Sequence, residues 1–367
     1  MKYEINMLSK ADMVKGHGVL SAYLEQFSLV SEGLPQFHFA ENSLHQYDVT
    51  HYHTINFDFY VRRWFRKRKE VGICSVHFLP ETVENSIQLP LPFKKAFYWY
   101  LIQFYKSMDI LVTVNPLFIE MLAKYGISAR KIVYIPNYVS EKDFYPMPAD
   151  QKKKRKAAFG LPPDQFLVLA VGQLQTRKGV IEFIELAREL PQYHFAWAGN
   201  FAFGKISKGQ KQIERAMQDL PDNISFLGLV PRERMNELYN AADVMFQPSF
   251  EELFPMTILE AMSAHIPLLL RDLEEYKGIL SGFYLKGSNN QEFAEALAYL
   301  QDPENYRRAA EQSAAGSQKY SRENVLKKWA AFYKRAWEMK QKKLGWFRMG
   351  KLTKWIRPAD ERTNESE

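Results

Sequence analysis

In the first half of the chain, short runs that mix apolar and β-branched residues with a few polar ones alternate with longer stretches of helical periodicity. The runs occupy residues 4–8, 48–53, 71–78 and 109–115, and amphipathic stretches such as residues 19–30 follow them. Short apolar runs are typical of strands buried on both faces of a parallel sheet, and the stretches between them predict helices that cover the sheet. The pattern therefore predicts an α/β fold.

The same alternation resumes after a break. Residues 140–160 contain Pro146, Pro148 and a run of basic residues, which predicts a linker. New strands and helices follow, and the helices from Asn290 to Lys334 are expected to complete this second half. Because 367 residues are typical of two domains, each half is expected to fold as one. The predicted parts are residues 1–145 and 146–320 as the two domains, 321–357 as a C-terminal helix and basic aromatic segment, and 358–367 as a polar tail.

Charge and cysteine content narrow the class of protein. The formal net charge is +7 and the isoelectric point is near 9.1, which predicts an anionic partner such as a membrane surface or a nucleic acid. The single cysteine, Cys74, leaves no disulfide framework within the chain and suits a reducing compartment. The first residues lack the apolar core of a signal peptide, and no run of about twenty apolar residues predicts a membrane span.

The segment from Pro248 to Met262 holds the strongest candidate chemistry. It reads as a turn, an acidic loop and an apolar helix, with Glu252 in the loop and Glu260 in the helix. Their separation of about two helical turns places the two carboxylates on roughly one face. The backbone N–H groups of residues 254–257 would lie at the helix N-terminus, where they could hold a phosphate or sugar hydroxyls. Two solvated surface glutamates would also explain this spacing.

Loops at the ends of other predicted strands carry further candidates. Arg177 and Lys178 stand at a predicted helix start, where two cations could neutralise a diphosphate leaving group, although basic surface turns are common. Gly16 and Gly18 lie between a strand and a helix, as in an anion-binding loop or an ordinary turn. They do not fit G-x-G-x-x-G, so a dinucleotide site is not supported. His77 ends a strand, where it is either structural or close to a ligand.

Three stretches interleave basic and aromatic residues, over residues 59–70, 91–106 and 334–357. Cations mixed with Trp and Tyr are typical of helices that lie at a membrane interface. The alternatives are a solvated helix for the first stretch and a core helix for the second. Nucleic acid would also accept the third stretch, but no nucleic-acid motif accompanies it. The candidate membrane residues are Arg62, Arg63, Trp64, Arg66, Lys67, Trp346, Phe347 and Trp355.

The acidic segment resembles the E-x7-E signature of retaining glycosyltransferase family 4, although Leu253 and Pro255 replace its two glycines. A second family segment, G-R-x-x-x-x-K-G, is similar to residues 172–179, with Gly172, Arg177, Lys178 and Gly179 retained and Gln173 in place of the usual Arg or Lys. The resemblance covers nearly the whole chain. It implies the GT-B fold, in which two Rossmann-like domains face an interdomain cleft.

The resemblance also implies roles for individual residues. The implied catalytic residues are Arg177, Lys178, Glu252 and His77. The implied donor-binding residues are Gly16, Gly18, Gly172, Val230, Glu252, Phe254, Met256, Thr257 and Glu260, with Glu252 near the sugar hydroxyls and Glu260 near the ribose diol. The implied acceptor-binding residues are His17, His77, Asn115 and Asn137. A UDP-hexose donor is implied, and neither a metal nor any other cofactor is expected.

Within the family, residues 9–25, 50–55, 76–82 and 104–119 are most similar to Gram-positive synthases that add a second hexose to monoglucosyldiacylglycerol. This similarity implies galactose transfer from UDP-galactose at the cytoplasmic face of the membrane, by a peripheral protein, to a product that can anchor lipoteichoic acid. No nucleic-acid partner is expected. Three alternatives stay open: a soluble, polysaccharide or protein acceptor, a monoglucosyldiacylglycerol synthase that uses UDP-glucose, and a membrane-bound scaffold without catalysis.

Overall fold

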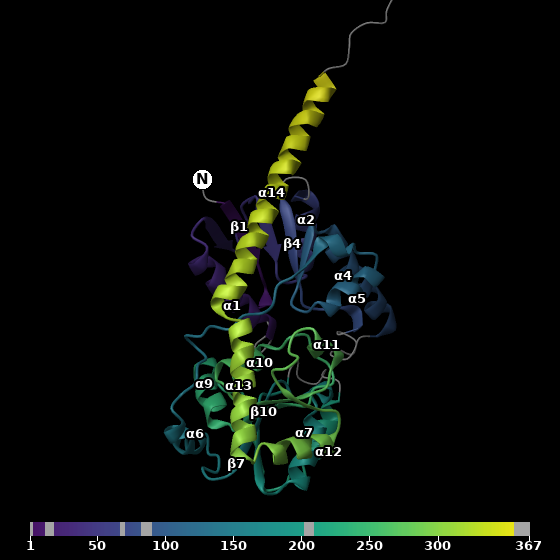
Figure 1. Ribbon diagram of the computed structural model, residues 1–367. Helices are drawn as coiled ribbons and strands as arrows, with labels where there is room; N and C mark the ends of the chain where they lie inside the picture. Colours follow the sequence, from purple (N-terminus) through teal and green to yellow (C-terminus); the bar gives the residue numbers. More distant parts are fainter. Residues whose placement is uncertain (1–2, 12–17, 67–69, 82–89, 202–208, 356–367) are drawn as a thin grey trace, which may run out of the picture.

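The computed structural model describes residues 3–11, 18–66, 70–81, 90–201 and 209–355, with side chains described up to Lys342. Within these residues the chain forms two parallel six-stranded sheets, each built from one half of the sequence. Figure 1 shows the two halves stacked along one long axis. This confirms the expected α/β fold of the GT-B type.

The first sheet has the strand order β2-β1-β3-β4-β5-β6. Its strands are β1 (Tyr3–Leu8), β2 (Phe37–Glu41), β3 (Val49–Tyr52), β4 (Val71–Val76), β5 (Ile110–Thr113) and β6 (Ile132–Tyr134). The helices between them are α1 (Gly18–Gly33), α2 (Phe57–Arg66), α4 (Leu91–Ser107) and α5 (Leu117–Lys124). Strands β3, β4 and β5 are buried at every position, as strands covered on both faces must be.

The second sheet has the strand order β12-β11-β10-β7-β8-β9. Its strands are β7 (Phe166–Val171), β8 (Tyr193–Ala198), β9 (Ile224–Gly228), β10 (Val244–Gln247), β11 (Leu268–Arg271) and β12 (Leu285–Gly287). Its helices are α6 (Lys152–Ala158), α7 (Val180–Glu189), α8 (Gln210–Ala216), α9 (Arg232–Ala241), α10 (Met256–Ser263), α11 (Glu274–Lys277), α12 (Asn290–Tyr299) and α13 (Pro303–Lys319). The central strands β7 and β10 both end at the loops that carry the candidate site.

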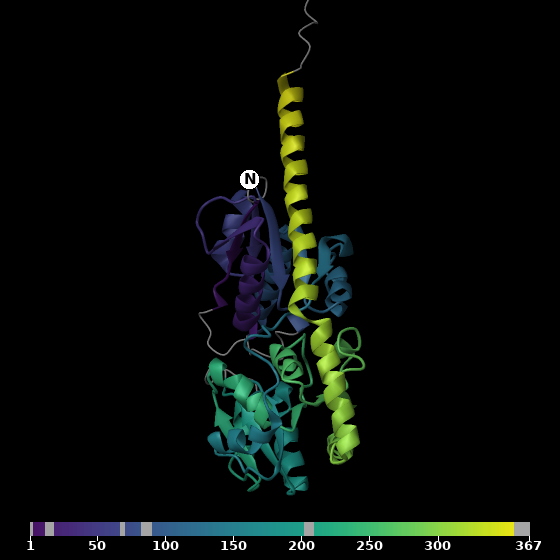
Figure 2. The same cartoon turned by 60° about the vertical axis from the view of Figure 1, so that its left-hand side comes forward.

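The last helix, α14 (Arg322–Trp355), returns to the first half. Figures 1 and 2 show it running along the first sheet and extending beyond it. Trp329, Phe332 and Tyr333 are buried in the same apolar core as β1, β3 and β4. The expectation that all helices up to Lys334 complete the second half is therefore wrong, because α14 buries its apolar face against the first sheet.

Candidate active site

The acidic loop connects β10 to α10. Because α10 begins at Met256, Glu252 lies in the loop and Glu260 lies in the second turn of the helix. Pro255 has an extended backbone (φ −67°, ψ 139°) just before the first helical residue, where a missing N–H costs α10 no hydrogen bond. The predicted helix is confirmed, and so is the predicted position of Glu252 in the loop before it. Because Glu252 is not helical, helical periodicity does not place its carboxylate on one face with that of Glu260.

A close approach of two loops brings Lys178 to the acidic loop. Gly179 has φ +77°, and a Cβ at this position would lie 2.5 Å from the carbonyl oxygen of Pro248, so only glycine leaves the required space. The Nζ of Lys178 consequently forms an ion pair with Oε1 of Glu252, and the two side chains are only 12% and 6% exposed. The end of β7 and the end of β10 thus share one buried ion pair.

Arg177 binds the same loop through both its backbone and its side chain. Its carbonyl oxygen accepts a hydrogen bond from the N–H of Phe250 at 2.8 Å, and its guanidinium donates to the carbonyl of Glu251 at 3.4 Å. Burial raises the pKa of Glu252, but the positive charges of Lys178 and Arg177 outweigh this effect and hold the pKa below its usual value. Glu252 is therefore an ionised acceptor of hydrogen bonds at neutral pH.

Glu260 has its own set of partners. Its Oε2 accepts a hydrogen bond from the hydroxyl of Tyr239 at 2.7 Å, and its Oε1 accepts one from the guanidinium of Arg232 at 3.0 Å. The same guanidinium pairs with Glu25 on α1, in the other half of the molecule. The two predicted glutamates therefore hold two different cations, one inside the second half and one between the halves.

Two asparagines of the first half hold the acidic loop. The Asn115 amide, which follows β5, donates to the carbonyls of Leu253 at 2.8 Å and Glu275 at 2.9 Å. Asn137, which follows β6, donates to the carbonyl of Phe254 at 2.8 Å. The carboxyl ends of β5 and β6 therefore face the end of β10. In this structure Asn115 and Asn137, two of the four residues expected to bind the acceptor, hold the loop in place.

Leu253, which replaces a family glycine, strengthens this contact. Its side chain packs against the apolar core formed by β3, β4, α4 and α5 of the first half. A glycine at this position would leave the loop without that contact. The departure from the family pattern thus adds an apolar link between the two halves.

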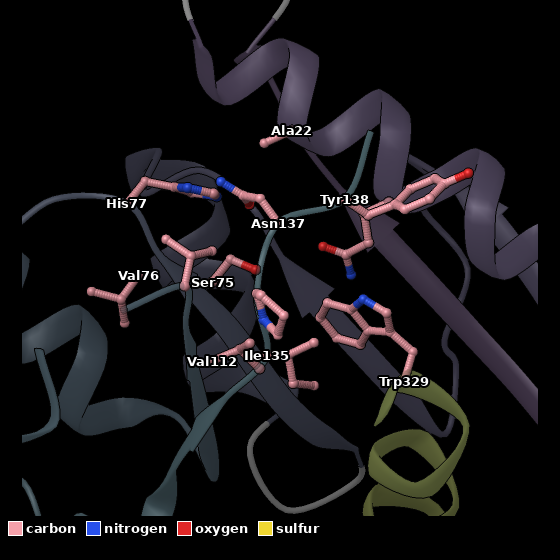
Figure 3. Close-up of a pocket in the computed structure, with 12 residues that line it drawn as sticks. Ala22, Ser75, Val76, His77, Val112, Ile135, Asn137, Tyr138 and Trp329 are labelled. Carbon is pink, nitrogen blue, oxygen red and sulfur yellow. The ribbon is translucent and has the colours of Figure 1, made fainter. Parts of the chain in front are cut away.

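A small cavity lies at the end of the first sheet, where α1 and α14 cover it. His77 and Asn137 line the cavity together with Trp329 from α14, as Figure 3 shows. Next to His77 lies His53, and next to His53 lies His51, with ring centroids 6.3 Å and 4.1 Å apart. The structure thus brings together two of the predicted acceptor residues, and it places His77 at the end of a row of three imidazole rings.

The remaining predicted donor residues fall into three groups. Gly16 lies outside the described residues, as does the predicted acceptor residue His17, and Gly18 is exposed at the start of α1. Phe254 and Met256 are buried in the second-half core, so only their backbone groups can face a ligand. The half-buried residues Gly172, Val230 and Thr257 lie on the loops after β7 and β9 and in the first turn of α10.

Sequence reasoning missed Arg232, Tyr239 and Glu25. Each is an ordinary residue of a predicted helix, and no motif distinguishes it. One signal was present: Arg232 comes directly after Pro231 at the predicted start of α9. A cation at a helix N-terminus opposes the helix dipole and indicates a nearby carboxylate.

The basic aromatic stretches divide into buried and exposed residues. On α2, Trp64 and Phe65 are 76% and 80% exposed, whereas Arg63 is fully buried and forms an ion pair with Asp109 at 2.7 Å. The expectation that Arg63 faces a membrane is wrong, because its side chain ties α2 to the first sheet. Arg62 and Arg66 instead donate to backbone carbonyls of residues 43–45. Lys67 and the side chains of Trp346, Phe347 and Trp355 lie outside the described part.

Helix α4 has one face buried in the protein and aromatic residues on its exposed face as well. Leu101, Phe104 and Tyr105 are buried against the first sheet, whereas Phe93 and Trp99 are exposed. Helices α2 and α4 contact each other, so their exposed rings lie on neighbouring elements. No helix in the described residues is long and apolar enough to cross a membrane. Among the same residues, no three His, Cys, Asp or Glu side chains are grouped so as to hold a metal ion.

Two Rossmann-like halves, with the carboxyl ends of their strands facing each other across a charged loop, define the GT-B fold. Solved structures share this fold. HepE from Anabaena, in complex with UDP and glucose, matches with a TM-score of 0.72 and 14% identity over 90% of this chain and 99% of HepE. Sucrose-phosphate synthase from Thermosynechococcus elongatus matches with a TM-score of 0.71 and 16% identity over 92% and 100% of the two chains.

Sequence comparison identifies the family. Residues 12–142 match the family described as Glycosyltransferase Family 4, and residues 151–316 match the family described as Glycosyl transferases group 1. The chain is 42% identical to the alpha-galactosylglucosyldiacylglycerol synthase of Streptococcus pneumoniae over 91% of this chain and 90% of that enzyme. It is 28% identical to the processive diacylglycerol alpha-glucosyltransferase of Acholeplasma laidlawii over 64% and 69%. The chain therefore belongs to glycosyltransferase family 4 and is a glycosyltransferase.

Proposed function

We propose that this enzyme transfers a hexose, galactose, from UDP-galactose to monoglucosyldiacylglycerol with retention of the anomeric configuration. The observation that carries the proposal is the buried Lys178–Glu252 ion pair beside Arg177, in a chain 42% identical to an enzyme named for the corresponding product. Two cations at the end of β7 suit a diphosphate leaving group, and an ionised carboxylate suits sugar hydroxyls. The positions proposed below for the donor and the acceptor follow from these three side chains.

The donor is proposed to lie between the loops after β7 and β10. The Lys178 ammonium has three N–H donors and gives one of them to Glu252. The diphosphate of the donor would accept hydrogen bonds from the others. Glu252 would then accept from the hydroxyls of the transferred sugar, and Glu260 from the ribose diol. Before the donor arrives, Glu252 keeps the Lys178 ammonium at the site.

The proposed reaction is a front-face displacement. The acceptor hydroxyl attacks the anomeric carbon on the side from which UDP departs, the bond from that carbon to the β-phosphate oxygen breaks, and the β-phosphate takes up the hydroxyl proton. Arg177 and Lys178 stabilise the negative charge that develops on the phosphate. His77 is proposed to donate a hydrogen bond to a sugar hydroxyl. With these charges in place, the proposed reaction uses neither a metal nor a cofactor.

The acceptor is proposed to approach from an anionic membrane surface on the cytoplasmic side. Supporting this proposal, Trp64, Phe65, Phe93 and Trp99 are exposed on neighbouring helices of the half that would bind the acceptor. Exposed rings next to basic residues are typical of proteins that lie on a lipid surface. The chain carries a net charge of +7, which favours anionic headgroups.

Sugar transfer from two donors tests the proposal. Labelled UDP-galactose and UDP-glucose are supplied in parallel to anionic liposomes that contain either diacylglycerol or glucosyldiacylglycerol. The proposal predicts labelled galactose on the glucosyl lipid and little label elsewhere. Glucose transferred to diacylglycerol would instead support the second candidate, a monoglucosyldiacylglycerol synthase, which the relative from Acholeplasma laidlawii favours. No transfer to either lipid would refute the lipid acceptor.

A further inference from the structure

Arg232 connects the donor side of the site to the opposite half of the molecule. Its guanidinium donates to Glu260 on α10 at 3.0 Å and pairs with Glu25 on α1. Glu25 is itself held, since its second carboxylate oxygen accepts from the N–H of Ser140 at 3.0 Å. A single cation thus bridges two buried carboxylates that come from different halves.

The position of Arg232 is unfavourable without these partners. It is the first residue of α9, where the positive end of the helix dipole opposes a cation. Its side chain is 41% exposed, so water could otherwise solvate it. The guanidinium instead lies over the ring of Phe144, 5.1 Å from the ring centre, and points into the contact between the halves. Two carboxylates and one aromatic face therefore fix its orientation.

We propose that Arg232 is a positioning residue that holds Glu260 in place for the ribose hydroxyls and is itself held by Glu25. The inference rests on the proposed function, in which Glu260 accepts the ribose diol of the donor. It adds that Glu25, on α1 of the N-terminal half, takes part in nucleotide binding through Arg232. Donor binding and contact between the halves are thereby coupled.

The acceptor positions on Glu260 are consistent with this role. Each carboxylate oxygen can accept two hydrogen bonds. Tyr239 uses one position on Oε2 and Arg232 uses one on Oε1, which leaves one on each oxygen for a vicinal diol. If Glu25 lost its charge, the guanidinium could turn toward water, and Glu260 would then be oriented by Tyr239 alone.

Nucleotide binding to two ligands tests the inference. The dissociation constants of UDP and 2′-deoxy-UDP are measured by titration calorimetry for the full chain, for Glu25→Gln and for Glu32→Gln. Glu32→Gln removes the same charge from the same helix, but Glu32 pairs with Lys142 and Arg322 rather than with Arg232. A general change in electrostatic potential affects both nucleotides equally. A change in affinity that depends on the hydrogen bond between Glu260 and the ribose affects UDP, which has the 2′-hydroxyl, more than 2′-deoxy-UDP.

We expect Glu25→Gln to weaken UDP binding by about fivefold or more, a typical size for coupling between sites, and 2′-deoxy-UDP binding by less than about twofold. Glu32→Gln should change neither. Arg232→Lys should behave like Glu25→Gln, because one ammonium cannot present the forked donors that bridge two carboxylates. This second variant carries the test if Glu25→Gln does not fold.

Two results would overturn the inference while the proposed donor stands: equal weakening for both nucleotides, or unchanged affinity for both in folded variants. A third result would contradict the proposed donor. If the unmodified protein does not bind UDP, the UDP-sugar assignment fails, and the role of Arg232 fails with it. Failure of the inference and failure of the proposed function are therefore distinguishable.

Discussion

Buried charges at the site are each matched by a partner from a different loop or helix. Removing one member of such a pair leaves the other unsatisfied in a place that water hardly reaches, which is costly. Lys178 and Glu252 illustrate this constraint, because neither would be stable there alone. The same property suits catalysis, since a charge held in a dry site acts strongly on a developing phosphate charge.

Lys178→Ala should lower kcat for sugar transfer by at least about tenfold, because it removes a cation that stabilises the leaving diphosphate. The protein should still fold, as judged by its circular dichroism. Lys153→Ala is the matched control, since Lys153 is exposed and pairs with Asp164 far from the loops. Full turnover by Lys178→Ala would show that its assigned role is wrong.

The predictable part of the site follows from local patterns. Arg177, Lys178 and Glu252 lie in short segments whose spacing resembles a family signature, so the sequence alone indicates them. The partners Arg232 and Glu25 are 207 positions apart, and their contact depends on how the two halves meet. Arg63 shows the opposite error: a basic residue among exposed aromatics is buried, because its helix turns it toward Asp109.

At the scale of elements, α14 and the first sheet are held together by a buried polar contact. The two ring nitrogens of His51 lie 2.9 Å from the hydroxyl of Tyr333 on α14 and 2.9 Å from the hydroxyl of Ser75 on β4. Burial, with a smaller effect from His77, lowers the pKa of His51 to about 3. His51 is therefore neutral in the folded protein at every pH above that value.

This contact predicts a loss of stability in mild acid. Below the ordinary histidine pKa of about 6.5, His51 binds a proton in the unfolded chain but not in the folded protein. The free energy of unfolding therefore decreases as the pH is lowered from about 6.5 to about 3. Between pH 7 and 5 the loss attributable to His51 is about 2 kcal/mol, from roughly 1.4 kcal/mol per unit below 6.5.

Urea unfolding at pH 7 and pH 5 measures this effect. His51→Gln should lower stability at pH 7 but should lose less on going to pH 5 than the unmodified protein does. His38→Gln is the control, since His38 is an exposed residue of β2. If His51→Gln keeps the full pH-dependent loss, the acid sensitivity does not come from His51.

The strands were predictable because runs such as residues 71–78 are rich in apolar and β-branched residues, as strands covered on both faces are. The placement of α14 was not. Its apolar residues Trp329, Phe332 and Tyr333 predict a buried helical face, but periodicity does not say which sheet covers it. That choice depends on the turn after α13, where the chain leaves the second half.

At the scale of the whole molecule, the two halves meet through polar and apolar contacts around the acidic loop. Asn115, Asn137 and Leu253 hold the loop from the side of the first sheet, and Glu25 with Arg232 adds a charged link. A donor bound to this loop would therefore contact residues of the second half that are themselves held by residues of the first half. The exposed rings of α2 and α4 belong to the N-terminal half, where the proposed acceptor binds.

Replacing both exposed rings of α2, Trp64→Ser and Phe65→Ser together, should weaken binding to anionic vesicles by about tenfold or more, because two rings are lost from the proposed lipid-facing surface. Cosedimentation with vesicles measures the change. Tyr299→Ser, at an exposed ring on α12 of the second half, should leave binding unaltered. Equal vesicle binding by the double variant would exclude this surface of α2 from lipid contact.

The most direct measurement is the rate of galactose transfer to one glucosyl head group presented in three forms. These are glucosyldiacylglycerol in anionic liposomes, the same lipid in neutral liposomes, and a water-soluble methyl glucoside, each with saturating UDP-galactose. Transfer should be fastest in anionic liposomes, slower in neutral ones and almost absent with the soluble glucoside. Transfer to the soluble glucoside that equals transfer to the lipid would contradict a membrane-bound acceptor.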